Sequence, residues 1–569
     1  MTPFFRGRRT RGALLMGLLV LPIMSLAQPT VMRASLAPAA NAPAASRSTT
    51  VVVPFSQAIA PATAGTIRLF SSQYRGQRTA TTSVSSNTVT LAPTAPTGSS
   101  AFRPGETVHV TIPSTVQSTG GTAATPYVYQ FTAATTGGSG TFSGGSDLPI
   151  SNQLTSVVLG DVDGDGDLDV ILGNVGGSTV NVRLNNGRGT FGGGFDPGVT
   201  SDPRRVRLGD VDGDGDLDLL TVTPFLFTGT VSVRLNDGSG QFSGGTTLTG
   251  FYQPEDVVLG DVDGDGDLDL VVANYRDNSV DIRLNNGNGT FRDGSTLPVG
   301  SNPESVVLGD VDGDGDLDLV VANSAVLGTV SIRLNNGSGT FSGGTDLAVS
   351  SQPTAVTLGD VDGDSDLDLA VTDYSKGLIH IRLNNGSGLF SGGSSVPVAT
   401  QPTGVLLGDV EGDGDLDLVV VNRAGSTSVN IRLNNGSGTF SGGSSPSIGL
   451  AALGLALGDI DGDGDLDLLT TDPINRSVTV RLNGGGPLPT RLATGTTALS
   501  LYPNPGRGRV QVTGLAPKAA VVVSDALGRP ITTARATAGG VAYLTLPPSL
   551  AAGVYFVRSE GHSQRLSVE

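Results

Sequence analysis

The sequence predicts an all-β protein whose main part is a seven-bladed β-propeller, and three observations lead to this prediction. An acidic stretch recurs seven times at nearly equal intervals, beginning at Asp161. A Gly-x-Gly-x-Phe unit precedes each acidic stretch at a constant distance, as Phe142 precedes Asp161. Each repeat also holds four short apolar or alternating runs, and four strands in about 50 residues are typical of a propeller blade.

Composition narrows the classes of function. The 569 residues exceed what one hydrophobic core organises, so we expect several domains. The chain has no Cys, which excludes disulfides and thiolate metal sites, and its three His lie far apart in sequence. A His triad, a zinc site or a His general base is therefore poorly supported. The net charge of −18 argues against nucleic acid as the main partner.

The N-terminal segment, 1–27, is predicted to be a signal peptide. Four Arg between positions 6 and 11 precede an apolar run that starts at Ala13, and Ser25-Leu26-Ala27 offers a small-residue cleavage site. A membrane anchor is the alternative, but the run is shorter than the roughly 20 apolar residues that a span needs. We therefore expect export to the extracellular space or the outer cell surface, with no membrane span after removal of the signal.

The region between the signal and the repeats is expected to hold a linker and a β-sandwich. Residues 28–47 are rich in Ala and Pro and predict a flexible linker. Residues 48–135 predict a small β-sandwich from their alternating runs, which lie at 66–70, 88–91 and 108–112. Together with the closing run at 127–132, this region resembles the bacterial Ig-like domains, and the resemblance implies an Ig-like β-sandwich.

The repeats occupy residues 136–486. In the first repeat we expect strands at 157–159, 168–172 and 180–184, then an Asn-Gly hairpin turn and a Gly-rich fourth strand around the Phe. The first Gly-x-Gly-x-Phe unit comes before any acidic loop, and none follows the last repeat. Residues 138–145 are therefore expected to complete the last blade and close the ring. An array of sandwiches is the alternative, but about 50 residues are too few for a closed sandwich.

The acidic loops have the chemistry of a site for a hard cation. Residues 161–169 read Asp-Val-Asp-Gly-Asp-Gly-Asp-Leu-Asp, with carboxylates at positions 1, 3, 5, 7 and 9 and Gly at position 6. Alternate side chains of a tight loop converge, which suits Ca²⁺ with its six to eight oxygen ligands better than the stricter Mg²⁺. An EF-hand is the alternative, but its position 12 requires Glu, and Leu172 stands there.

This pattern resembles the FG-GAP or VCBS repeats of integrin-α-like propellers over residues 136–486. The resemblance implies up to seven Ca²⁺, one per blade, bound by the side chains of positions 1, 3, 5 and 9 and by the main-chain carbonyl of position 7. Two loops depart from the pattern, with Ser365 at position 6 and Glu411 at position 3. The candidate metal residues, by loop, are Asp161, Asp163, Asp165, Asp167 and Asp169; Asp210, Asp212, Asp214, Asp216 and Asp218; Asp261, Asp263, Asp265, Asp267 and Asp269; Asp310, Asp312, Asp314, Asp316 and Asp318; Asp360, Asp362, Asp364, Asp366 and Asp368; Asp409, Glu411, Asp413, Asp415 and Asp417; and Asp459, Asp461, Asp463, Asp465 and Asp467.

The C-terminal part is expected to be a further domain behind a linker at 487–497. Residues 498–569 include Tyr-Pro-Asn-Pro at 502–505 and Gly-Val-Tyr-Phe-Val at 553–557. These phrases resemble the C-terminal sorting domain of type IX secretion substrates of Bacteroidetes. The resemblance implies a β-sandwich that is recognised by the type IX secretion machinery and then anchored or released. Another adhesive sandwich is the alternative.

For the function, the sequence favours a non-enzymatic binding or adhesion module with an extracellular protein or glycan as its ligand. The alternatives are a propeller hydrolase or lyase that acts on polysaccharide, and a purely structural spacer. An enzyme would need a convergent acid and base outside the acidic loops, and the sequence offers no such pair. It also lacks Trp, the side chain that most often stacks on sugars.

The binding surface is expected on the face opposite the acidic loops. Hairpins alternate between the two ends of a blade, so the loops between the second and third strands share one face with the blade-to-blade connections. These loops vary in length and composition between repeats, and simple drift among unconstrained loops is the alternative explanation. The candidate residues on this face are Phe225, Phe227, Phe251, Tyr252, Tyr275, Arg276 and Tyr374.

Overall fold

A computed structural model gives the structure of the chain, and its two compact units, Met1–Gly486 and Pro487–Glu569, are described separately. The described residues are 27–94, 100–423, 428–484, 500–502, 509–513, 518–524, 529–537, 541–547, 550, 553–559 and 562–568. Apart from Ala27, the predicted signal peptide lies outside them, and so does the predicted linker at 487–497. Within these residues, no helix is both long and apolar enough to cross a membrane.

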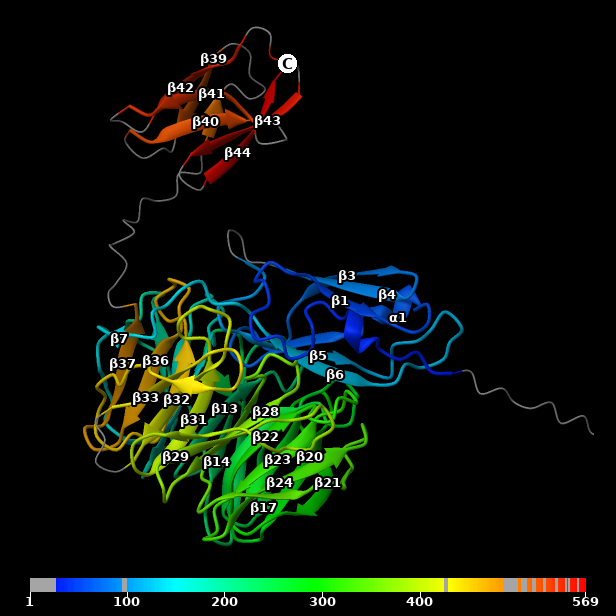
Figure 1. The fold of residues 1–569 in the computed structure, drawn as a ribbon, viewed down its shortest axis with the longest axis vertical. Helices are drawn as coiled ribbons and strands as arrows, with labels where there is room; N and C mark the ends of the chain where they lie inside the picture. The colour runs from blue at the N-terminus through cyan, green and yellow to red at the C-terminus, as the bar shows by residue number, and fades with distance from the viewer. Residues whose placement is uncertain are drawn as a thin grey trace, which may run out of the picture. The chain divides into compact units, whose positions relative to one another are not determined.

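The N-terminal domain consists of two three-stranded antiparallel sheets with a shared core (Figure 1). Val53, Leu91, Val110 and Phe131 are among the core residues that both sheets contribute. The prediction of an Ig-like β-sandwich is confirmed. In sheet order, the strands are β1 (Val51–Pro54), β4 (Thr88–Pro93) and β3 (Ala80–Ser85), then β2 (Arg68–Ser71), β5 (Thr107–Ile112) and β6 (Tyr127–Thr132); the two short helices are η1 (Arg33–Ser35) and α1 (Pro61–Ala64).

Residues 28–47 belong to this domain and are not a flexible linker, so that prediction is wrong. Leu36, Ala40 and Ala45 are buried in the core of the domain. The segment also makes isolated β-bridges, such as Ala37 with Val52. The Ala-rich composition suggested a spacer, but small apolar side chains also fit closely against a sheet, and the composition does not separate the two.

Seven antiparallel sheets follow, one for each sequence repeat, and the all-β propeller prediction is confirmed. The long strands form where β-branched residues and Leu run without interruption, because both faces of these strands are buried. The strands of the first four sheets are β9 (Gln153–Gly160), β10 (Asp169–Val175), β11 (Asn181–Asn185) and β12 (Phe191–Gly192); β13 (Arg205–Gly209), β14 (Asp218–Thr223), β15 (Gly229–Asn236), β16 (Phe242–Ser243) and β17 (Thr247–Phe251); β18 (Pro254–Gly260), β19 (Asp269–Asn274), β20 (Ser279–Asn285) and β21 (Phe291–Pro298); and β22 (Pro303–Gly309), β23 (Asp318–Asn323), β24 (Gly328–Asn335), β25 (Phe341–Ser342) and β26 (Asp346–Ser350).

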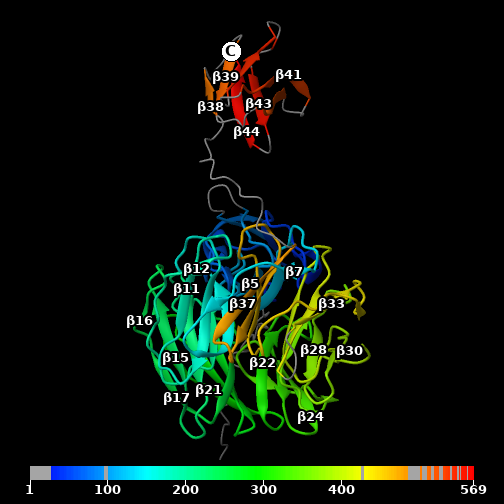
Figure 2. The same ribbon diagram turned by 90° about the vertical axis from the view of Figure 1, so that its left-hand side faces the viewer.

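The outer strands of the last sheet come from the start of the repeat region, as the sequence predicts. Phe142 pairs with Asn483 and Leu148 with Val478, and the strands lie side by side in Figure 2. The first and last sheets also share one core cluster, so the ring is closed. The remaining strands are β27 (Val356–Gly359), β28 (Asp368–Asp373), β29 (Leu378–Arg382) and β30 (Ser395–Pro397); β31 (Pro402–Gly408), β32 (Asp417–Asn422), β33 (Asn430–Asn434) and β34 (Phe440–Ser441); and β35 (Leu455–Gly458), β36 (Asp467–Asp472) and β37 (Ser477–Asn483) with β7 (Phe142–Ser143) and β8 (Leu148–Pro149).

A glycine before each acidic loop acts as a socket for the neighbouring sheet. A Cβ added to Gly160 would lie 2.4 Å from Cδ1 of Leu208, a residue of the next sheet. Around the ring the same relation holds as far as Gly458, whose Cβ would lie 2.9 Å from Cδ1 of Leu159 in the first sheet. The recurring Leu-Gly-Asp therefore encodes the contact between sheets, because only Gly leaves room for the leucine.

The C-terminal unit also consists of two sheets. Val512, Val521 and Leu544 belong to one buried cluster that both sheets share, which agrees with the predicted β-sandwich. Its strands, in sheet order, are β38 (Ser500–Tyr502), β39 (Arg509–Thr513) and β42 (Ala542–Thr545), then β41 (Pro530–Arg535), β40 (Ala520–Ser524), β43 (Gly553–Ser559) and β44 (His562–Val568).

Candidate functional site

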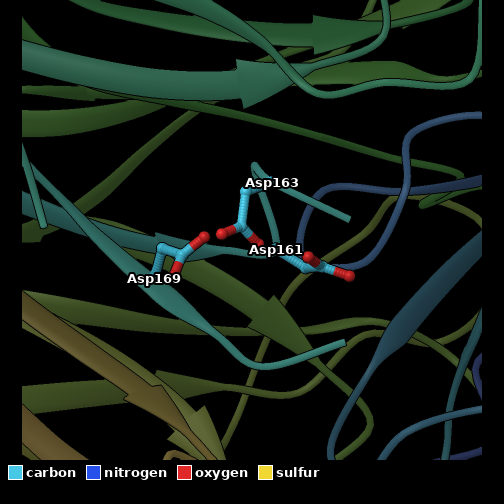
Figure 3. Close-up of side chains that lie close together, drawn as sticks. All are labelled: Asp161, Asp163 and Asp169. Carbon is cyan, nitrogen blue, oxygen red and sulfur yellow. The ribbon is translucent and has the colours of Figure 1, made fainter. Parts of the chain in front are cut away.

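Each acidic loop connects the first and second strands of its sheet and begins directly after the socket glycine. In the first loop, ligand atoms of Asp161, Asp163 and Asp169 all lie within 4.8 Å of one another. Figure 3 shows the carboxylates of Asp163 and Asp169 turned toward each other. Positions 1, 3 and 9 form the same group in the second, fourth and fifth loops, whereas positions 1, 3 and 5 form it in the third.

The carboxylate at position 9 is held rigidly at the start of the second strand. Oδ2 of Asp169 accepts a hydrogen bond from the Val162 amide at 3.0 Å, and Oδ1 accepts one from the Asn185 amide at 2.8 Å. All seven position 9 side chains are fully buried. Burial raises the pKa of Asp169 to about 7, against the effect of the two amide donors. A cation in the loop would offset this cost of burial.

The carboxylate at position 1 turns the loop back on itself. Oδ2 of Asp161 accepts from the Gly166 amide at 3.1 Å, while its buried Oδ1 has no hydrogen-bond partner. The same holds for one buried oxygen of Asp263 and of Asp362, both at position 3. Burial also raises the pKa of Asp161 to about 6. Buried carboxylate oxygens that lack a donor and lie close to other carboxylates fit a divalent cation.

Position 7 has a different place in the structure. A Cβ added to Gly187 would lie 2.5 Å from Oδ2 of Asp167, so this carboxylate lies against the hairpin turn between the third and fourth strands. The same contact recurs in the other repeats, for example between Gly386 and Asp366. The Asp167 side chain is thus not part of the group that Asp161, Asp163 and Asp169 form, in keeping with a role for its carbonyl rather than its carboxylate.

The two divergent loops keep the general path of the chain. Ser365 has φ of +73°, the left-handed conformation of the glycines at this position, and its amide donates to Oδ2 of Asp360 at 2.9 Å. In the sixth loop the Asp413 amide donates to Asp409 Oδ1 at 3.1 Å, whereas the first loop uses position 3 as the acceptor. The third loop, in which Asp263 stands at position 3, makes the same bond from the Asp265 amide to Asp261 Oδ1 at 3.2 Å, so this change of acceptor does not result from Glu411.

One asparagine per repeat ties each loop to its neighbour, and the sequence analysis did not identify this role. Nδ2 of Asn335 donates to Leu317 O of its own loop at 3.1 Å and to Val262 O of the preceding loop at 2.8 Å. Equivalent bonds run round the ring, and Asn185 closes it by donating to Ile460 O at 2.8 Å. The signal in the sequence was the first Asn of the recurring Asn-Asn-Gly, which the turn alone does not require.

The N-terminal domain covers the acidic-loop face, which no pattern in the sequence predicted. Its polar and backbone groups form hydrogen bonds with the loops of six repeats, and Pro126 packs against the loop of the third repeat. The contacts, in loop order, are Gln73 O with the Asp161 amide at 2.8 Å, the Gln77 amide with Asp210 Oδ2 at 2.8 Å, Pro126 packed on Gly264, the Val128 amide with Gly315 O at 2.6 Å, Asn41 Nδ2 with Ser365 O at 3.0 Å, Thr135 Oγ1 with Asp409 Oδ2 at 2.8 Å, and the Thr136 amide with Gly464 O at 3.1 Å.

Charge is complementary across this contact. Arg33 Nη2 lies 3.4 Å from Asp366 Oδ1, and Arg75 Nη2 donates to Gly164 O at 2.9 Å. Burial raises the pKa of Asp267, and the charge of Arg68 opposes that rise. The N-terminal domain thus supplies positive charge where the loops concentrate negative charge.

The predicted ligand-face residues lie at the opposite end of the sheets, and one of them is not available. Phe251 is fully buried, with the Arg283 guanidinium 5.1 Å from its ring centroid, so its inclusion was wrong. Phe225, Phe227 and Tyr252 are 41%, 79% and 47% exposed. The sequence could not separate Phe251 from Tyr252, because Phe251 is the last residue of β17 and Tyr252 follows it directly. Of the remaining candidates, Arg276 is exposed, and Tyr275 and Tyr374 are half-buried.

These loops form a continuous surface around Gln253. Its amide donates to Phe225 O at 3.1 Å, and its carbonyl accepts from the Tyr275 amide at 3.0 Å. In residues 27–484, as far as the structure describes them, eight of eleven exposed large hydrophobic side chains lie in loops of this face. The eight are Phe225, Leu226, Phe227, Tyr252, Val326, Leu327, Leu450 and Ile474. We call this end of the ring the open face.

A serine, a histidine and an aspartate meet in the fifth sheet, although a His-based triad had little support from the sequence. His380 Nε2 lies 3.2 Å from Asp373 Oδ2, and its Nδ1 lies 2.8 Å from Ser395 Oγ. Polar side chains occupy the equivalent places in other sheets, as in the chain from Asn323 through Ser331 to Asp346. The arrangement is thus the fifth sheet's version of a polar ladder across three strands.

Comparisons with known proteins agree with this architecture. The FG-GAP-like repeat family matches residues 161–221, 225–272, 261–321, 310–371, 360–420 and 409–470, and a bacterial Ig-like domain matches residues 27–133. No curated protein matches the chain at a significant level.

Similar solved structures share only a low level of sequence identity with this chain. BBS1N in complex with ARL6DN is 15% identical over 60% of this chain and 97% of its own, with a TM-score of 0.43. An Agrocybe aegerita lectin is 21% identical over 57% of this chain and 86% of its own, with a TM-score of 0.37. Virginiamycin B lyase from Staphylococcus aureus is 13% identical over 59% of this chain and 98% of its own, with a TM-score of 0.40. Because the repeat matches together span more than half of the 569 residues, the chain belongs to the FG-GAP-like repeat proteins.

Proposed function

We propose that this protein is a calcium-stabilised, non-enzymatic binding module that works outside the cell, secreted or attached to the surface. The observation that carries this proposal is the unequal treatment of the two faces. The acidic-loop face is covered by the N-terminal domain, whereas the open face gathers most of the exposed large hydrophobic side chains. Large exposed apolar patches are rare on soluble proteins, and where they occur they often mark interaction sites.

In this proposal the calcium ions have a structural role. The carboxylates of positions 1, 3, 5 and 9 would hold one ion per loop, which supplies positive charge at the point where buried carboxylates meet. The chain's own groups hold the loops in place as well. The Asp at position 9 fixes the start of the second strand, and the first Asn of each hairpin turn joins neighbouring loops. A stiff ring then presents the open-face loops in fixed positions.

The partner that fits the open face best is an extracellular protein. Phe225, Leu226 and Phe227 form an apolar loop tip in the second repeat. Val326 and Leu327 form a second apolar tip in the fourth repeat. Apolar side chains of this kind anchor protein interfaces, whereas glycan sites usually combine stacking aromatics with many hydrogen-bonding groups. A glycan ligand is therefore the second outcome of the test below.

Export is proposed to use the predicted signal peptide and the type IX secretion machinery, which would recognise the C-terminal sandwich. The resemblance of residues 498–569 to sorting domains supports this route. Fractionation of the native host, with mass spectrometry of the mature ends, tests it. A cytoplasmic, full-length protein would contradict it.

The binding proposal is tested by screening the calcium-loaded protein on arrays of extracellular proteins and glycans. The variant Phe225→Ser/Phe227→Ser is expected to lose at least ~tenfold in affinity for the captured partner. Leu389→Ser is the matched control, because Leu389 is 55% exposed and lies in the turn between β29 and β30, at the acidic-loop end of the ring. Unchanged affinity of the folded double variant would remove this patch as the binding site.

The hydrolase alternative has one observation in its favour, the contact of Asp373, His380 and Ser395. Turnover of a polysaccharide or ester on the same arrays, abolished by Ser395→Ala, would establish it. If the arrays detect neither capture nor turnover, the result favours a purely structural spacer.

A further inference from the structure

Each sheet of the ring carries one arginine on its third strand, and among the described residues a carboxylate near the outer strand neutralises it in four of the seven sheets. In the fourth sheet, Arg333 Nη1 lies 2.9 Å from Asp346 Oδ1, and the side chain of Asp346 is 49% exposed. These pairs are therefore within reach of solvent. The four pairs are Arg183 with Asp196 at 2.5 Å, Arg283 with Asp293 at 3.4 Å, Arg333 with Asp346 at 2.9 Å, and Arg481 with Asp147 at 2.9 Å.

The other three sheets lack this carboxylate. Asp346 is the fifth residue after Phe341, and a serine or threonine stands at the same position in the second, fifth and sixth sheets. Within the described part of the chain, the hydrogen bonds of these three guanidinium groups go to backbone carbonyls, and none of the three forms a salt bridge. A half-buried guanidinium without a carboxylate keeps an uncompensated charge. The residues concerned are Arg234 with Thr247, Arg382 with Ser395, and Arg432 with Ser445.

The unpaired guanidinium of the fifth sheet is held in the same way as the paired one of the fourth. Arg382 Nη1 donates to the carbonyl of the preceding residue at 2.8 Å, and Arg333 Nη1 does the same at 2.9 Å. Ser395 also occupies the place of Asp346, because the two residues lie opposite equivalent positions of their third strands. Ser395 is exposed and shorter than Asp, so a carboxylate from solvent can reach Arg382. The fifth sheet thus holds one half of an ion pair and leaves the other half open to a ligand.

The sixth sheet brings a second unpaired guanidinium to the same outer strand. Arg432 Nε donates to Pro397 O at 3.3 Å, and Pro397 is the last residue of β30, the strand that begins at Ser395. Figure 2 shows β30 at the periphery of the ring. Residues 391–395 and 441–445 both read Ser-Gly-Gly-Ser-Ser, and neither of these described segments exposes a large hydrophobic side chain. This strip of the rim is therefore polar and cationic, unlike the apolar tips of the open face.

We propose that this rim site binds an acidic polysaccharide, with carboxylates of its uronate residues on Arg382 and Arg432. Carboxylates fit because an aspartate fills the same place in the first, fourth and seventh sheets, and a planar guanidinium can bind a carboxylate through two hydrogen bonds. A polysaccharide fits because serine hydroxyls can bond to sugar hydroxyls, whereas a protein interface would need apolar anchors that this strip lacks. The proposal goes beyond the proposed function, since none of its residues belongs to the open-face loops.

The test measures binding of the calcium-loaded full chain to immobilised hyaluronan, which carries one glucuronate in every disaccharide, with neutral dextran as the blank. We expect saturable binding to hyaluronan that weakens as salt rises. Ser395→Asp/Ser445→Asp supplies the missing carboxylates from within the chain, and it is expected to weaken binding at least ~tenfold without lowering the melting temperature. Ser201→Asp/Ser301→Asp is the matched control, because it adds the same charge at exposed positions of the open face and should bind as the wild type does.

A second pair of variants tests the arginines directly. Arg382→Gln/Arg432→Gln removes the two unpaired guanidinium groups and is expected to weaken binding as strongly as the aspartate variant. Arg188→Gln/Arg204→Gln removes the same charge from exposed positions elsewhere and should leave binding unchanged. This comparison separates a specific site from a general attraction between the polyanion and the protein.

The rim proposal and the proposed function can fail separately. Phe225→Ser/Phe227→Ser alters the open face, so it should leave hyaluronan binding unchanged. The rim proposal is overturned if hyaluronan is not bound, if poly-L-glutamate is bound in its place, or if folded Ser395→Asp/Ser445→Asp binds as well as its control.

Discussion

The acidic-loop face and the open face are made by the same seven repeats, but they differ in regularity, charge and covering. On the acidic side, the spacing from the Phe to the first Asp is identical in every repeat, as between Phe142 and Asp161. On the open side, the spacing from the first Asp to the Arg of the third strand varies, and it is longest in the second repeat, from Asp210 to Arg234. Loops that bind each other and a neighbouring domain have fixed lengths, whereas loops that only end a strand pair are free to differ.

The covering follows the same division. Polar contacts from the N-terminal domain to six of the loops, together with packing of Pro126 on the third loop, occupy the acidic-loop face. The open face keeps exposed Phe and Leu side chains. The comparison suggests that cations act on one face and that molecular partners act on the other.

Removal of calcium is expected to have the largest effect on this difference. In excess chelator the melting temperature should fall by ~10 °C or more, because the folded state loses ligands that the unfolded chain binds weakly. The N-terminal domain should also loosen, since it rests on the loops. As the chain has no Cys, two introduced Cys, one in each domain, can carry dyes for a distance measurement. An unchanged melting temperature would contradict the calcium assignment.

Loss of one asparagine that joins two neighbouring loops is expected to have the second-largest effect on stability. Asn335→Ala leaves two buried carbonyls without their donor, which should cost about 2–4 kcal/mol in the free energy of unfolding. Asn336→Ala is the matched control, because that neighbour is exposed in the turn and should cost below ~1 kcal/mol. Chemical denaturation with calcium present measures both variants. Equal losses would show that this asparagine does not join the loops.

The response to pH sharpens the same comparison. Burial raises the pKa of Asp218, Asp269 and Asp318 to about 8, well above the value of an unfolded Asp. Without calcium, the folded state therefore holds protons more tightly than the unfolded state, and it should lose stability as pH rises from about 4 to 8. Calcium competes with these protons, so its stabilising effect should grow over the same window. Melting curves with and without calcium from pH 5 to 8 measure this, and a pH-independent difference would contradict it.

The smallest expected effect is a gain in the free energy of unfolding. Ser365→Gly places a residue without a Cβ at φ of +73° and should stabilise the protein by ~1 kcal/mol. Ser338→Gly, in an exposed turn where φ is not positive, is the control and should not stabilise. Denaturation at fixed calcium distinguishes the two, and a loss of stability in Ser365→Gly would mean that the serine side chain has a function of its own.

Much of the metal-site geometry could be predicted because it is local. Nine consecutive residues contain all the carboxylates of one loop, and the turn that brings them together is specified by glycines within the same stretch. Ring closure was also readable, since the unit around Phe142 had no other sheet to complete. The role of Asn335 was missed because its second partner, Val262, lies in a different repeat.

By itself, the sequence determined the all-β repeats, the chemistry of the acidic loops and the closure of the ring, because each depends on residue types at short, regular spacings. Only the tertiary structure decided that residues 28–47 belong to the N-terminal domain, that this domain covers the acidic loops, and that Phe251 is buried while Tyr252 is exposed. These features depend on which surfaces meet across long separations in the chain. Local propensity and periodicity carry no record of such contacts, since they describe one segment at a time.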